Sequence, residues 1–268
     1  MRACFIKFYF ILFILCLNIF LNMCHKYNFE KNYKIIKRNN NNKLIINFNI
    51  SSNIKYVKSS KDYWEKRYSY GGNSGAGSYN NLALFKASII NNFVSKNKIN
   101  TVIEWGSGDC NQLSLANYKK YIGYDVSKTA IKICQKKFKK DKAKTFIHIS
   151  DNFINDKKAD LSISLDVIYH LLENNIFNLY MQNLFNSSKK YVCIYSSNFD
   201  KKWAKHVRHR KFTDWINKYI SNEWKIKEYI PNKYPFDIKN KDSTSFADFF
   251  FYEKIECKFR FFNKCFFL

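Results

Sequence analysis

The stretch that most constrains the fold of this chain runs from Thr101 to Asp125. It opens with an apolar run that ends around Glu104, turns through Gly106 and Gly108, and closes with a second apolar run. Strand-forming residues on both sides of a glycine turn predict a strand, a tight turn, a helix and a second strand. The carboxyl ends of neighbouring parallel strands form the edge of a sheet at which ligands bind. Glu104 and Asp125 are therefore expected to frame a ligand crevice lined by glycine backbone.

Two classes of nucleotide ligand are compatible with an acid roughly 20 residues beyond a glycine turn. A dinucleotide turn requires a third glycine, and Asn111 stands in its place. Glu104 would repel a pyrophosphate, whereas it would attract the ammonium and sulfonium of S-adenosylmethionine. The ribose hydroxyls of that molecule suit a carboxylate such as Asp125. The residues favour S-adenosylmethionine, and a nicotinamide-dependent oxidoreductase is the alternative.

Further periodic segments continue an alternation of strands and helices. Strands are expected at 145–149, 159–165, 191–195 and 245–252, and amphipathic helices at 79–96, capped by Ser78, and at 127–138. This alternation is typical of an α/β fold with a parallel sheet. The residues expected to face the core from the first helix are Leu82, Leu84, Phe85, Ile89, Ile90 and Phe93.

Two motifs carry a family resemblance. Glu104, Gly106 and Gly108 match the pattern E/D-x-G-x-G-x-G, in which Cys110 replaces the last glycine, and residues 166–171 read D-x-x-x-H-L at the end of the fourth strand. The chain resembles the class I S-adenosylmethionine-dependent methyltransferases, and residues 63–254 resemble bacterial-type methyltransferase-domain proteins. The resemblance implies a Rossmann-like α/β domain over residues 62–255, with a seven-stranded, mostly parallel sheet and helices on both faces.

The resemblance also implies which residues bind S-adenosyl-L-methionine. Asp125 would hold the ribose, and Asp151 follows the third strand, where the family places a polar residue against the adenine amino group. Asp166 stands at the tip of the fourth strand. The implied cofactor-binding residues are Glu104, Gly106, Ser107, Gly108, Asp125, Val126, Asp151, Asn152 and Asp166.

The methyl acceptor is predicted to be a small anionic molecule. Residues 206–210 hold four basic or titratable side chains beside the expected active-site edge, and arginine binds carboxylates and phosphates in bidentate fashion. Val167 and Ile168 stand where methylases of base amines have prolines, which disfavours such a substrate. The expected substrate-binding residues are Tyr63, Arg67, Tyr169, Arg208 and Arg210.

Such enzymes depend on alignment of the reacting atoms more than on a base. His170 is the best candidate to deprotonate a hydroxyl or amine acceptor, and His209 is the second. Tyr63, Trp64 and Arg67 precede a glycine-rich loop at 71–77. This segment is expected to form either a lid over the site or a surface linker with packed aromatic rings.

The net charge of +25 permits an anionic partner such as RNA, so an RNA-binding or RNA-modifying protein is a second alternative. Lysine and asparagine are enriched along almost the whole chain, and a solvated basic surface explains the charge more simply. The eight cysteines are scattered and contain no C-x-x-C pair. They argue against a metal site and against a disulfide framework alike.

Both ends of the chain differ in composition from the domain. Residues 5–23 are almost all apolar, so residues 1–24 read as a signal peptide or a signal anchor, which would be the one contact with a membrane. Residues 25–61 are rich in Asn and Lys and are expected to be disordered. This leader resembles those that send proteins through the secretory route to an apicoplast-like plastid, and a secreted or membrane-anchored protein is the alternative. The aromatic tail at 256–268 would pack on the domain or bind a partner.

Overall fold

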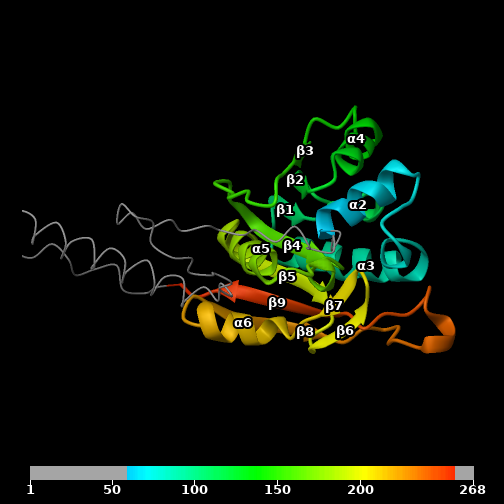
Figure 1. The fold of residues 1–268 in the computed structure, drawn as a ribbon. Coiled ribbons are helices and arrows are strands. Elements are labelled where there is room, and N and C mark those ends of the chain that lie inside the picture. Colours follow the sequence, from blue (N-terminus) through cyan, green and yellow to red (C-terminus); the bar gives the residue numbers. More distant parts are fainter. Residues whose placement is uncertain (1–58, 257–268) are drawn as a thin grey trace, which may run out of the picture. The chain divides into compact units, whose positions relative to one another are not determined.

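Seven strands form the central sheet of the computed structural model, which describes residues 59–256. Their order is β3-β2-β1-β4-β5-β9-β8, as Figure 1 shows. The strands are β1 (Thr101–Trp105), β2 (Lys120–Asp125), β3 (Lys144–His148), β4 (Ala159–Leu165), β5 (Ser188–Ser196), β8 (Trp224–Ile230) and β9 (Asp248–Lys254). The first five pair in parallel, and β9 runs antiparallel to both of its neighbours. The predicted seven-stranded, mostly parallel sheet is confirmed.

Helices cover both faces of this sheet, because the side chains of the strands alternate between two apolar cores. In β1, Val102 packs in the core on one face and Ile103 in the core on the other. Helices α3 (Asn80–Lys96) and α4 (Lys128–Lys137) contribute to the first core, and α5 (Asn174–Asn186) and α6 (Phe212–Tyr219) to the second. Strands buried on both faces read as nearly continuous apolar runs, which is why β1, β4 and β5 could be located in the sequence.

Smaller elements complete the description. Helix α2 (Ser60–Ser69) comes first in the chain, followed by the short turn η1 (Ala76–Ser78) and then by helix α3. The N-terminus of α2 is capped by the Ser59 hydroxyl, which accepts a hydrogen bond from the amide of Asp62. The other short turns are η2 (Gln112–Leu115), η3 (Ile168–His170) and η4 (Ile238–Asn240). A two-stranded hairpin of β6 (Lys201–Ala204) and β7 (Val207–His209) lies between β5 and α6 in the chain.

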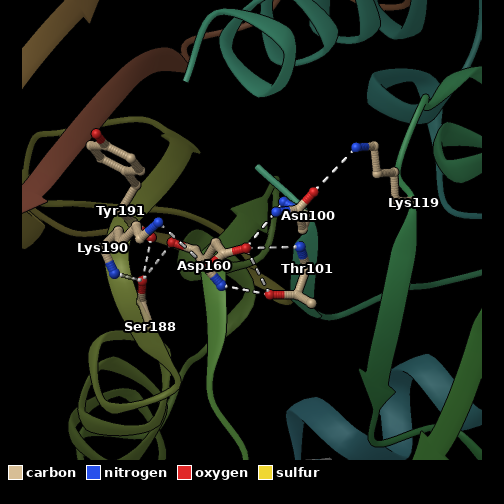
Figure 2. Close-up of polar contacts among 7 residues, drawn as sticks. All are labelled: Asn100, Thr101, Lys119, Asp160, Ser188, Lys190 and Tyr191. Carbon is tan, nitrogen blue, oxygen red and sulfur yellow. Dashed lines mark hydrogen bonds and ion pairs between the residues drawn. The ribbon is translucent and has the colours of Figure 1, made fainter. Parts of the chain in front are cut away.

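Asp160 fastens the edge of the sheet where β1 and β4 begin (Figure 2). Its Oδ2 atom accepts hydrogen bonds from the backbone amides of Asn100 at 3.0 Å and Thr101 at 3.1 Å, and from the Thr101 hydroxyl at 3.1 Å. Burial alone would raise the pKa of Asp160, but these hydrogen bonds outweigh it, so the pKa is lowered. The network fixes the register of β1 against β4. It thereby also fixes the relative positions of Glu104 and Asp166 near the carboxyl ends of these two strands.

Several local predictions need correction. Strand β8 and the β6–β7 hairpin were not predicted, because their side chains are largely exposed and give no apolar pattern. Ser78 does not cap α3, whose N-cap is Tyr79 without a side-chain hydrogen bond, and Leu84 on that helix is exposed. Ser127 does cap α4, since its hydroxyl accepts from the amide of Ala130 at 3.1 Å.

The cysteine prediction is wrong on one point. Cys110 and Cys134 form a disulfide across 24 residues. It joins the loop after β1 to α4, two segments that the parallel sheet brings together although no sequence motif links them.

The predicted leader (residues 1–24 and 25–61) and the predicted tail (residues 256–268) lie outside the described residues, except for residues 59–61 of the leader and residue 256 of the tail. Of those three, Ser60 already belongs to α2. The cellular address stays a prediction, which a fluorescent reporter fused to residues 1–60 would test. Within residues 59–256, no helix combines the length and the apolar character needed to cross a membrane.

Candidate active site

One cavity opens at the carboxyl ends of β1, β2, β3 and β4. Its wall contains eight of the nine predicted cofactor-binding residues, namely Glu104, Gly106, Ser107, Gly108, Asp125, Val126, Asp151 and Asp166. The ninth, Asn152, is exposed and does not line the cavity, because the loop after β3 turns Asp151 and Phe153 toward the wall instead. The parallel topology therefore gathers residues that lie up to 62 positions apart in the sequence, from Glu104 to Asp166, at one edge of the sheet.

The glycine turn brings bare backbone to this cavity. Gly106 has a φ of 84°, and a Cβ atom there would lie 2.5 Å from Cγ2 of Val167; Gly108 has a φ of 56°, and a Cβ atom there would lie 2.3 Å from Oγ of Ser74. Both positions thus need glycine for conformation and for space. Cys110, at the place of the family's last glycine, keeps the left-handed conformation with a φ of 58°. Its bond to Cys134 holds this residue in a conformation that costs roughly 1 kcal/mol or more without glycine.

Two buried acids face each other across the turn. Asp125 accepts hydrogen bonds of 2.8 Å from the backbone amides of Gly108 and Ser127, and burial raises its pKa to about 6. Glu104 accepts a hydrogen bond of 2.5 Å from the Tyr121 hydroxyl, and burial raises its pKa to about 7. Carboxylates held out of water in this way are stabilised by a cationic or hydroxyl-bearing ligand.

The donors and acceptors of the wall fit S-adenosylmethionine. The Ser107 hydroxyl is buried and has no hydrogen-bond partner among the described residues, although it lines the cavity. An unpaired buried hydroxyl costs free energy unless a ligand or water satisfies it. Together with the bare glycine backbone and the acids Glu104, Asp125 and Asp151, it provides partners for a ligand that carries positive charge, ribose hydroxyls and an amino-purine.

A buried lysine that the sequence analysis missed holds Asp166. Lys86, on α3, is 0% exposed, and its Nζ atom lies 2.5 Å from Oδ2 of Asp166. The other oxygen of Asp166 accepts from the Tyr169 hydroxyl at 2.7 Å, which removes Tyr169 from the predicted substrate contacts. A backbone φ of 60° also marks Asp166 as conformationally restrained. The signal was present, because Lys86 interrupts an inward face formed by Leu82, Ala83, Ala87 and Ile90.

The two predicted catalytic histidines differ in position. His170 lines the cavity, and its Nδ1 atom donates to the backbone carbonyl of His206 at 2.9 Å, which leaves Nε2 as a hydrogen-bond acceptor. Burial lowers the pKa of His170 to about 4, so the ring is neutral at physiological pH. His209 is buried outside the cavity wall, hydrogen-bonded to Ser197 at 2.7 Å and packed against Phe199. Of the two candidate bases, the structure therefore brings only His170 to the cavity wall.

Helix α2 forms a wall of the cavity rather than a surface linker. Trp64 and Tyr68 line the cavity, as does Ser74 in the glycine-rich loop. Tyr63 and Arg67, predicted to bind substrate, do not: Tyr63 stacks on His206, and Arg67 donates to the backbone carbonyl of Asn73 at 2.6 Å. Both side chains instead make contacts outside the cavity wall.

Two carboxylates fasten α2 over the cavity. Glu173 accepts from the amide of Ser60 at 3.1 Å and from its hydroxyl at 2.7 Å. Glu65 accepts from the hydroxyls of Ser127 at 2.7 Å and Thr129 at 2.6 Å, at the start of α4. The lid is thus tied to the beginnings of both α5 and α4.

The predicted anion-binding arginines are turned away from the cavity. Arg210 donates to the backbone carbonyls of Leu171 and Leu172 and to Asn174, while Arg208 donates to Leu172 and Asn174. Neither side chain lines the cavity. The carbonyls after η3 have no strand partner, so these guanidinium groups satisfy them instead of a substrate anion. The structure therefore does not bring Arg208 and Arg210, which were predicted to bind the acceptor, to the cavity wall.

Comparisons with known proteins come from structure alone. No protein-family model matches the chain, and no curated protein matches its sequence. Among solved structures, the N-methyltransferase NodS from Bradyrhizobium japonicum WM9, in complex with S-adenosyl-L-homocysteine, has a TM-score of 0.59 at 14% identity, over 74% of this chain and 100% of NodS. Magnesium protoporphyrin IX methyltransferase ChlM from Synechocystis PCC 6803, with S-adenosylmethionine bound, has a TM-score of 0.53 at 14% identity, over 74% of this chain and 98% of ChlM.

A third match points to the same architecture. The methyltransferase domain of bacterial CtHen1-CN has a TM-score of 0.50 at 17% identity, over 65% of this chain and 100% of that domain. The name of ChlM states its acceptor, magnesium protoporphyrin IX, and the likeness of this chain to all three proteins concerns the fold. Together with the strand order and the cavity at the carboxyl ends of β1, β2 and β4, it shows that this chain has the class I methyltransferase fold.

Proposed function

We propose that this protein is an S-adenosylmethionine-dependent methyltransferase that acts on an oxygen or nitrogen atom of a small acceptor. The observation that carries this proposal is the convergence of Glu104, Asp125 and the glycine turn on one cavity. In this assignment Asp125 holds the ribose hydroxyls, Asp151 the adenine amino group, and the backbone from Gly106 to Gly108 the methionine end. When bound, the cofactor supplies an activated methyl group on a sulfonium.

The chain contributes alignment and exclusion of water. Trp64 and Tyr68 of the lid close the cavity from one side, and Val167 and Leu171 from another. Holding the nucleophile and the methyl group at near-attack distance in a dry site supplies most of the acceleration in such reactions. His170, neutral because of its lowered pKa, is a hydrogen-bond acceptor that orients an acceptor N–H or O–H. It is too weak a base to carry the reaction by proton abstraction.

A small acceptor fits this arrangement better than an RNA strand. The lid helix is tied at Ser60 and at Glu65, so the cavity is covered rather than open along a groove. Among residues 59–256, Lys61 is the one lysine that lines the cavity.

Methyl transfer from labelled S-adenosylmethionine tests the proposal. Incubation of the purified protein with pooled small metabolites is expected to place label in a small molecule and to release S-adenosylhomocysteine. A parallel incubation with total RNA is the control. Label that enters RNA, and no small molecule, would contradict the proposed acceptor, and activity that falls steeply with salt would accompany that result.

A further inference from the structure

The charge of the cavity is opposite to that of the chain. The sequence has 46 Lys and Arg against 21 Asp and Glu. In the cavity wall the balance reverses, because one lysine, Lys61, stands against the carboxylates of Glu104, Asp109, Asp125, Asp151, Asp166 and Glu173. If lysines were placed without preference in this lysine-rich chain, the cavity wall would also carry a net positive charge. The cavity therefore suits ligands that carry positive charge, by direct Coulomb attraction in a partly dry site.

Most of these acids already have a partner or an assigned role. Asp166 is paired with Lys86, and Asp109 accepts from the amide of Ser74 at 2.9 Å and from the Tyr79 hydroxyl at 2.8 Å. Glu104, Asp125 and Asp151 belong to the cofactor in the proposed function. Glu173 is the acid that remains.

Glu173 lies just before α5 and is half-buried. It takes hydrogen bonds from Ser60 but forms no ion pair within residues 59–256. Burial lowers the pKa of Arg210 and the charge of Glu173 acts to raise it, so the two groups interact electrostatically. The Arg210 guanidinium nevertheless donates its hydrogen bonds to the carbonyls of Leu171 and Leu172 and not to Glu173. A half-buried carboxylate that forms no ion pair gains Coulomb energy when a ligand brings a cation to it.

Two other groups that line the same cavity are also suited to a cation. The Nε2 atom of His170 accepts hydrogen bonds, because Nδ1 carries the proton. The ring of Trp64 lies edge-on to His170, with the centroids 4.9 Å apart, and both line the cavity. Aromatic rings and hydrogen-bond acceptors together bind ammonium groups, whereas within residues 59–256 no arginine lines this cavity to give an anion bidentate donors.

We propose that the methyl acceptor is a small primary or secondary amine, bound as its ammonium ion with Glu173 as the anchoring carboxylate. This inference rests on the proposed function and names its substrate class. For transfer, the ammonium first releases one proton to water. The free amine then gives its lone pair to the methyl carbon, a C–N bond forms, the C–S bond breaks, and sulfur keeps that electron pair. The products are the methylated ammonium ion and S-adenosylhomocysteine.

Matched panels of acceptors test this proposal. Labelled S-adenosylmethionine is incubated with butylamine, ethanolamine and phenethylamine, and separately with butyrate, glycolate and 3-phenylpropionate. The expected result is label in at least one amine and in none of the carboxylates. Label in carboxylates alone would overturn the proposal, while failure of the wild type to bind S-adenosylmethionine would overturn the proposed function itself.

Glu173→Gln separates charge from structure, because glutamine keeps an oxygen for the Ser60 amide. For the amine that reacts, KM is expected to rise roughly tenfold, the loss of one charge-assisted contact, with the affinity for S-adenosylmethionine unchanged. The exposed Glu223, changed to glutamine, is the matched control and should leave KM unaltered. An unchanged KM in Glu173→Gln, or an equal rise in Glu223→Gln, would contradict the anchoring role.

Discussion

Replacing Arg210 with methionine is expected to lower the free energy of unfolding by about 3 kcal/mol. The guanidinium donates to the Leu171 carbonyl at 3.1 and 3.0 Å and to the Leu172 carbonyl at 3.0 Å, and it lies 4.6 Å over the ring of Phe177. Burial lowers the pKa of Arg210 to about 10, so the group is still charged at neutral pH. Methionine fills the space but leaves the Leu171 carbonyl without its donor and the Leu172 carbonyl with Arg208 alone. Urea denaturation followed by circular dichroism measures the change.

Arg208→Met is the matched control. Arg208 donates to the same Leu172 carbonyl at 3.2 Å and to Asn174 at 3.0 Å, in a more exposed position, so its loss is expected to cost below about 1 kcal/mol. A different result would contradict this structural role. If Arg210→Met kept the wild-type stability but lost turnover, that result would indicate that Arg210 binds the acceptor.

Reduction of the Cys110–Cys134 disulfide is expected to lower the free energy of unfolding by about 3 kcal/mol, because the bridge closes a loop of 24 residues in the unfolded chain. The same bridge restrains Cys110, whose positive φ a free side chain would adopt less readily. Affinity for S-adenosylmethionine should therefore fall with reduction. Urea denaturation with and without dithiothreitol measures the first effect.

The variant with alanine at both cysteines is the control for this experiment. It should unfold at the denaturant concentration of the reduced wild type and should not respond to dithiothreitol. Peptide mapping under non-reducing conditions detects the bridge directly. Recovery of both thiols unmodified from the oxidised protein, with no effect of dithiothreitol on stability, would contradict the bridge.

The sheet and the cofactor edge could be predicted because their signals are local. Apolar runs mark β1, β4 and β5, and Gly106 and Gly108 mark the turn between β1 and the following segment. The acid after β2 then falls beside that turn in any right-handed parallel arrangement. Eight of nine predicted cofactor residues consequently line one cavity.

The acceptor side could not be predicted in the same way. The orientation of its side chains depends on partners that lie far away in the sequence. Lys86 and Asp166, which form an ion pair, are 80 positions apart. The sequence shows that residues 206–210 are basic, but it does not show where their side chains point. Only the structure shows that Arg208 and Arg210 point to the carbonyls after η3, and that His209 is packed among aromatic rings.

The disulfide was missed for a related reason. Spacing identifies cysteine pairs only when the fold is known, because a bridge requires that two Cα atoms come within about 7 Å. Cys110 and Cys134 meet because α4 packs beside the glycine turn, and no cysteine motif encodes that contact.

Calorimetric titration of the purified protein with S-adenosylmethionine and, separately, with NAD tests the central claim most directly. The account predicts that S-adenosylmethionine binds and NAD binds poorly. It also predicts that Asp125→Ala weakens the binding of S-adenosylmethionine by about 2 kcal/mol, since the ribose hydroxyls lose a charged acceptor, while the exposed Asp242→Ala has no effect. Preferential binding of NAD, or an unchanged affinity in folded Asp125→Ala, would contradict it.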